Sequence, residues 1–67
     1  GHIMKIYIQK EQKHKEMRFR GTAGALLKKL GIDPRTVIVT KNDSLVSEDD
    51  KLEDSDTVEI LDVVSGG

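Results

Sequence analysis

The sequence predicts an α+β domain in which one helix packs across a mixed sheet of four or five strands. Three observations lead to this class. The chain has only 67 residues, its apolar residues alternate at every second position near both ends, and the period becomes helical between them. A chain of this length builds one domain with one two-layer core. The expected order of elements is β-β-α-β-β-β.

The N-terminal part is predicted to be a β-hairpin. Residues 4–8 alternate between apolar and polar side chains, which is typical of a strand with one buried face. Residues 9–14 are polar or charged and are predicted to be the turn. Residues 16–20 alternate again, with Met17 and Phe19 on one side. Neither strand contains proline, so both can take part in a hydrogen-bonded ladder.

The helix is expected over Thr22–Leu30. Thr22 can cap the first turn, because its hydroxyl can accept a bond from an unpaired backbone N–H. Gly31 suits the left-handed residue that ends a helix, and Pro34 prevents its continuation. The apolar stripe follows the i, i+3, i+4, i+7 spacing of one buried helix face, at Ala23, Leu26, Leu27 and Leu30.

The second half is predicted to contain three strands. Residues 36–40 are mostly β-branched and indicate a buried strand, residues 41–44 supply a turn, and residues 45–46 form a brief strand. The acidic residues 47–56 are expected to be a solvated loop before the last strand, residues 57–64. Insertion of that strand beside the first satisfies the right-handed crossover rule. The expected core consists of Ile6, Ile8, Met17, Phe19, Leu26, Leu27, Leu30, Val37, Val39, Val58 and Ile60.

Composition excludes several classes of function. There is no cysteine, so disulfides, a thiolate nucleophile and a CxxC zinc site are excluded. No apolar run approaches the roughly 18 residues of a membrane span, and no apolar h-region of a signal peptide is seen in the sequence. We therefore expect a cytoplasmic monomer with no membrane partner. Residues 1–3 are interpreted as a remnant of cloning, with residues 4–64 as the domain and 65–67 as a flexible tail.

Charge is distributed unevenly along the chain. Residues 1–41 hold ten Lys and Arg against three Asp and Glu, a net of +7, whereas residues 42–67 hold one Lys against nine acids, a net of −8. Tyr7 and Phe19 are the only aromatic residues, so the stacking surface that usually accompanies a basic nucleic-acid site is missing. Two complementary halves of one domain are the favoured interpretation, and no nucleic-acid partner is expected.

The C-terminal Gly66-Gly67 is the feature of the sequence that indicates a chemical reaction. Glycine lets the backbone enter a narrow channel and adopt conformations closed to other residues. A C-terminal carboxylate is ionised at neutral pH and could attack the α-phosphate of ATP in another protein's active site. The chain has no GxxxxGK[ST] loop to bind ATP itself. It is therefore interpreted as a substrate and carrier and not as a catalyst. The alternative is a frayed or truncated end without function.

Other candidate residues are weaker. His14 has no second histidine at ligand spacing, so a surface histidine is favoured over a metal ligand. Asp49, Asp50, Asp54 and Asp56 lack an apolar setting and are interpreted as surface charge; no catalytic or metal site is expected. Leu61 and Val63 should point away from the core if alternation is unbroken. An exposed apolar patch there would be a docking surface, although dimerisation or a bulge would explain it equally.

Nearly all of residues 4–67 resemble the ThiS/MoaD sulfur carriers and the small archaeal modifiers, which are ubiquitin-like proteins with the β-grasp fold. The resemblance lies in the order of elements, in the hairpin of residues 39–46 and in Leu52–Ile60. That segment is similar to the family's L-x-D-G-D-x-V-E-I, with Ser55 where glycine is usual, which leaves the turn geometry open. The tail Val63-Val64-Ser65-Gly66-Gly67 is similar to the family's hydrophobic residue, small residue and Gly-Gly.

The resemblance implies adenylation of Gly67 by a ubiquitin-activating-like enzyme that uses ATP and Mg, with no cofactor bound to the carrier itself. Ser65 and Gly66 would be needed for activation, and Leu61, Val63 and Val64 would bind partners. The product would be a thiocarboxylate, passed to sulfur-transfer enzymes, or an isopeptide bond to a lysine of a target protein, which a deconjugating protease could reverse. A non-covalent β-grasp interaction module is the third hypothesis.

Overall fold

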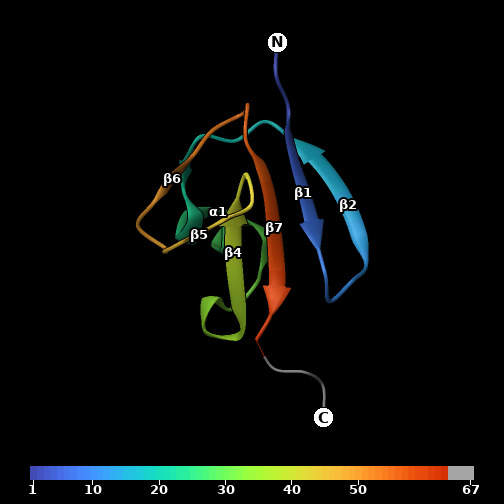
Figure 1. Ribbon diagram of the computed structural model, residues 1–67, viewed down its shortest axis with the longest axis vertical. Helices are drawn as coiled ribbons and strands as arrows, with labels where there is room; N and C mark the ends of the chain where they lie inside the picture. The colour runs from blue at the N-terminus through green and yellow to red at the C-terminus, as the bar shows by residue number, and fades with distance from the viewer. Residues whose placement is uncertain (64–67) are drawn as a thin grey trace.

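The computed structural model describes residues 1–63 and shows a five-stranded sheet crossed by one helix (Figure 1). The sheet has the strand order β2-β1-β7-β4-β5, and β3 and β6 form a separate two-stranded pair. The elements are β1 Met4–Ile8, β2 Lys13–Met17, β3 Gly21–Thr22, α1 Ala23–Leu30, the 3₁₀ turn η1 Pro34–Thr36, β4 Val37–Lys41, β5 Ser44–Val46, β6 Lys51–Leu52 and β7 Thr57–Asp62. The predicted α+β class and mixed sheet are confirmed.

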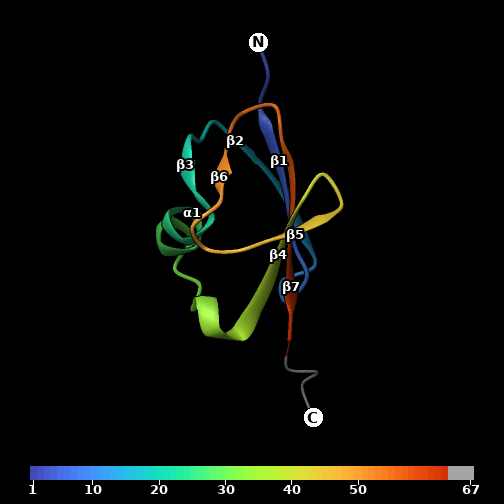
Figure 2. The same ribbon diagram turned by 60° about the vertical axis from the view of Figure 1, so that its left-hand side comes forward.

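Strand β7 is the central strand of the sheet. It pairs in parallel with β1, where Ile6 lies opposite Val58, and antiparallel with β4, where Val39 lies opposite Ile60. The last strand thus lies beside the first, as predicted, and the helix covers one face in the β-grasp arrangement. Figure 2 shows α1 and the β3–β6 pair on one side of the sheet, while the other face is left open. No helix within residues 1–63 is long and apolar enough to cross a membrane.

Helix α1 begins and ends where the sequence predicts. The Ala25 N–H donates to the Thr22 hydroxyl oxygen over 3.1 Å, so Thr22 is the N-cap. Gly31 has a φ of 73°, in the left-handed region that favours glycine, and its N–H donates to the Lys28 carbonyl. Because so short a helix is marginal alone, its burial against the sheet is what stabilises it.

The core largely follows the prediction. Its buried apolar residues are Met4, Ile6, Ile8, Ala23, Leu26, Leu27, Val39, Leu52, Val58 and Ile60. Met17, Phe19, Leu30 and Val37, which were expected inside, are only partly buried at its margin. Met4, Ala23 and Leu52 were not on the predicted core list, although Ala23 was in the predicted buried stripe of the helix. Met4 is buried because it lies in β1 with the same alternation as Ile6 and Ile8.

The hairpin differs from its predicted bounds. Strand β2 covers Lys13–Met17 and not residues 16–20, so the turn is shorter than expected. It closes early because Gln12 adopts a positive φ of 52° and donates its N–H to the Gln9 carbonyl over 3.1 Å. The sequence pattern predicted a turn over residues 9–14 but not its early end, since glutamine is uncommon in the left-handed region.

The expectation of a wholly solvated loop over residues 47–56 is wrong. Strand β6 lies within it and pairs with β3, and Leu52 is buried in the core. The loop also covers the start of α1, because the Ala23 and Gly24 N–H groups donate to the carbonyls of Asp50 and Glu48 over 2.8 and 3.0 Å. These bonds satisfy backbone donors that the first turn of a helix leaves unpaired.

Three aspartates in this segment have structural contacts that their interpretation as surface charge did not include. Asp50 accepts the Ser47 N–H over 2.8 Å; the other two are Asp54 and Asp56. Asp54 accepts the Phe19 N–H over 2.6 Å. Asp56 is only 8% exposed and accepts from the Glu53 N–H over 2.8 Å. Between them, Ser55 does not have a positive φ, so this turn accommodates serine without the conformational freedom of glycine.

Candidate functional site

The candidate site is the end of β7, where the chain leaves the sheet. Strand β7 ends at Asp62, and the Val63 N–H donates to the Thr36 carbonyl over 3.1 Å. This end of the strand lies at the opposite end of the molecule from the N-terminus (Figure 1). The predicted tail residues Val64, Ser65, Gly66 and Gly67 lie outside the described residues.

An apolar patch lies on the open face of the sheet beside this exit. Leu61 pairs with Ile38 across β7 and β4, and Leu45 pairs with Thr40 across β5 and β4, so these side chains share the face opposite to Ile60. Ile38, Leu45 and Val63 are 39%, 73% and 47% exposed, and Leu61 is half-buried. Residues 36–40 were expected to be a buried strand, and Val39 and Thr40 are buried, but Ile38 is exposed on the open face. We call Ile38, Leu45, Leu61 and Val63 the open-face patch.

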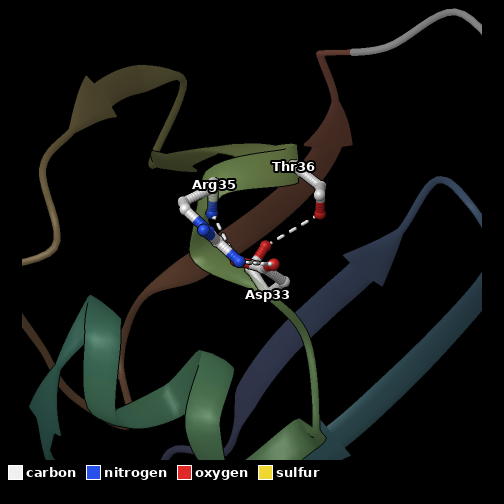
Figure 3. A network of polar contacts seen from close by, with 3 residues as sticks. All are labelled: Asp33, Arg35 and Thr36. Carbon is white, nitrogen blue, oxygen red and sulfur yellow. Dashed lines mark hydrogen bonds and ion pairs between the residues drawn. The ribbon is translucent and has the colours of Figure 1, made fainter.

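The 3₁₀ turn η1 positions the backbone that holds the exit. Asp33 caps it: the Arg35 backbone N–H donates to the Asp33 carboxylate over 2.9 Å, and the guanidinium forms an ion pair with it over 3.0 Å (Figure 3). The Thr36 hydroxyl donates to the Asp33 carbonyl over 2.8 Å. Hydrogen bonds from Arg35 hold the pKa of Asp33 below its usual value, and the same pairing raises the pKa of Arg35.

The ion pair between Asp33 and Arg35 joins residues two positions apart, so it does not link the basic and acidic halves of the chain. Within residues 1–63 it is the only salt bridge between side chains, and both partners belong to the basic half of the sequence. The two oppositely charged halves do pack together, with the acidic segment against the start of α1. In the described part of the chain they are joined by hydrogen bonds and core contacts and not by direct ion pairs.

The other predicted candidates form no hydrogen bond with Asp62 or Val63 within the described residues. His14 packs against Tyr7 on the β1–β2 hairpin, with ring centroids 4.8 Å apart, and within residues 1–63 no three potential ligands are grouped for a metal ion. Sequence reasoning missed the roles of Gln9 and Thr36 at the exit. The Asp33-Pro34 pair could have indicated η1, since aspartate followed by proline is a common start of a helical turn. No pattern identified Gln9.

The fold and site define a β-grasp protein whose central strand leads into a diglycine end. Comparison with known proteins gives the family: the ThiS family model matches residues 5–67. The chain is also similar to sulfur carrier protein TtuB of Thermus thermophilus, with 32% identity over 57 residues, covering 85% of this chain and 88% of that protein. The chain therefore belongs to the ThiS family, and the predicted resemblance is confirmed.

Proposed function

We propose that this protein is a sulfur carrier whose reactive group is the C-terminal carboxylate of Gly67. The observation that carries the proposal is the extent of the family match, which runs to residue 67 and so includes Ser65-Gly66-Gly67. The similarity to a protein named as a sulfur carrier supports the same function. In this proposal the chain is a substrate of other enzymes and catalyses no step itself.

The proposed chemistry takes place in two steps on a partner enzyme that binds ATP and Mg. A carboxylate oxygen of Gly67 attacks the α-phosphorus of ATP, which releases pyrophosphate and leaves an acyl-adenylate. A sulfide donor then attacks the carbonyl carbon and displaces AMP, and the product is a thiocarboxylate. Two glycines before the carboxylate leave the path into the active site free of side chains.

The open-face patch is the proposed docking surface for the activating enzyme. It combines exposed apolar side chains with the point at which the chain leaves β7. Four residues follow Val63, and a fully extended chain of that length spans at most about 14 Å. An enzyme that activates Gly67 must therefore bring its ATP site within that distance of the patch. This limit favours contacts on the sheet face around Leu61 and Val63 over contacts on the far side of α1.

The same acyl-adenylate could be attacked by a lysine amine, which would make the chain a protein modifier. Mass spectrometry of material from the native host separates these products. The sulfur-carrier proposal predicts intact protein heavier by the difference between sulfur and oxygen, located on Gly67. Gly-Gly remnants on lysines of other proteins would indicate conjugation. Unmodified carrier under every growth condition, with no remnants, would favour the non-covalent interaction module.

A further inference from the structure

The hydrogen-bond ladder between β1 and β7 ends in an unusual way. Its last regular bond runs from the Gln9 N–H to the Ile60 carbonyl over 3.0 Å. The regular spacing of a parallel ladder would next join the Asp62 N–H to the Gln9 main-chain carbonyl. In the structure that carbonyl instead accepts the Gln12 N–H that closes the hairpin turn.

The side chain of Gln9 supplies the missing acceptor. The Asp62 N–H donates to Gln9 Oε1 over 2.8 Å, across 53 positions of sequence. On the other side of β7, the Val63 N–H donates to the Thr36 carbonyl over 3.1 Å. The last two described residues of the chain are thus held on both sides, by the side chain of Gln9 just after β1 and by the Thr36 carbonyl just before β4.

We propose that Gln9 is a positioning residue for activation of the C-terminus. By replacing a main-chain acceptor, its amide keeps β7 in strand conformation up to Asp62 and thereby fixes where the tail begins. It also keeps Leu61 and Val63 on the open face. This inference rests on the proposed function, because a defined starting point matters only if the tail must reach an active site.

Loss of this bond should affect binding more than chemistry. Without it, the Asp62 N–H would turn to water and the end of β7 could fray on the β1 side. An activating enzyme would then have to order these residues on binding, which costs conformational entropy. Once the carboxylate is seated, the reaction itself would be unchanged. The expected signature is a higher KM for the carrier with the same kcat.

Three variants test the role of the amide. Gln9→Ala removes the acceptor, Gln9→Glu keeps an acceptor oxygen at the same reach, and Gln12→Asn changes an exposed amide in the same turn while tolerating its positive φ. Amide hydrogen exchange should be about two- to tenfold faster at Asp62 in Gln9→Ala, the range that corresponds to one net hydrogen bond. Gln9→Glu and Gln12→Asn should exchange as the wild type does.

The kinetic arm uses full-length carrier with its activating enzyme, ATP and Mg. KM for Gln9→Ala should rise by a similar factor of about two to ten, with kcat retained and with KM restored in Gln9→Glu. If the wild type is adenylated and Gln9→Ala has the wild-type KM, the positioning role is wrong while the proposed function stands. A wild-type protein that is not adenylated at all overturns both.

Discussion

Replacing Asn42 by alanine should be among the most destabilising changes outside the apolar core. Asn42 and Asp43 form the two-residue turn between β4 and β5, with φ values of 51° and 72°. Two successive left-handed residues characterise the type I′ hairpin turn, in which asparagine is favoured at the first position. Alanine at this position would be strained by about 1 kcal/mol.

The side chain of Asn42 adds two hydrogen bonds that join this turn to the start of β7. Its Nδ2 donates to Asp56 Oδ1 over 3.0 Å, and its Oδ1 accepts the Thr57 N–H over 2.9 Å. Each is worth about 0.5–1.5 kcal/mol, with more lost where a buried partner atom is left unpaired, as Asp56 Oδ1 would be. With the strain, the expected cost of Asn42→Ala is about 2–4 kcal/mol. Proteins of this size unfold with only about 3–10 kcal/mol in total.

Urea and thermal denaturation of matched variants measure this cost. Asn42→Ala should lower the melting temperature by about 10 °C or more. Asn42→Gly should recover about 1 kcal/mol, because it relieves the strain but not the lost bonds. Asn42→Asp keeps the turn conformation but replaces the Nδ2 donor by a carboxylate oxygen that faces the carboxylate of Asp56. This variant should therefore also be less stable than the wild type. If Asn42→Ala stays within about 0.5 kcal/mol of the wild type, as ordinary surface changes do, the assigned role of this turn is wrong.

Three further predictions follow from individual contacts. Leu52→Ala should lower the free energy of unfolding by about 2–5 kcal/mol, measured by urea denaturation, because it opens a cavity. Leu45→Ala changes a side chain that is 73% exposed and should be nearly neutral. Equal losses in the two variants would contradict the assigned core. The lowered pKa of Asp33 means that its pairing with Arg35 stabilises the fold above the unfolded-state pKa and that this contribution is lost as pH falls through the folded-state value. An NMR titration placing that carboxyl at or above its ordinary pKa would refute this. Val63→Asp should weaken binding to the activating enzyme, measured by calorimetry, with an unchanged melting temperature; unfolding would instead indicate that Val63 supports the core.

The elements with a strong local signal could be predicted from the sequence. Helix α1 has a capping threonine, an apolar stripe and a terminal glycine, and its bounds agree with the prediction to within a residue. The alternation in residues 57–64 predicted the last strand, which ends at Asp62 in the structure, and the outward direction of Leu61. These features depend on residues close together in sequence, where periodicity and capping act directly.

The features that were missed depend on contacts between distant segments. Leu52 lies in an acidic stretch, and its burial follows only from the pairing of β6 with β3. The bond from Asp62 to Gln9 likewise joins positions 53 residues apart, whereas the turn at Gln12 is local and was missed because glutamine is uncommon at a positive φ. At the candidate site, the open-face patch could be anticipated at Leu61 and Val63 but not at Ile38 and Leu45. Their exposure depends on which strands flank β4 and on which face α1 covers.

Pyrophosphate exchange tests the central claim most directly, because adenylation of Gly67 is reversible. The wild-type chain, incubated with its activating enzyme, Mg and ATP, should exchange labelled pyrophosphate into ATP. Deletion of Gly66-Gly67 should abolish exchange with almost no change in melting temperature, since glycine has no side chain to pack. One residue added after Gly67 should do the same, because it moves the carboxylate by about 3.5 Å. Exchange that persists in the deletion variant would contradict the proposal that Gly67 is the activated group.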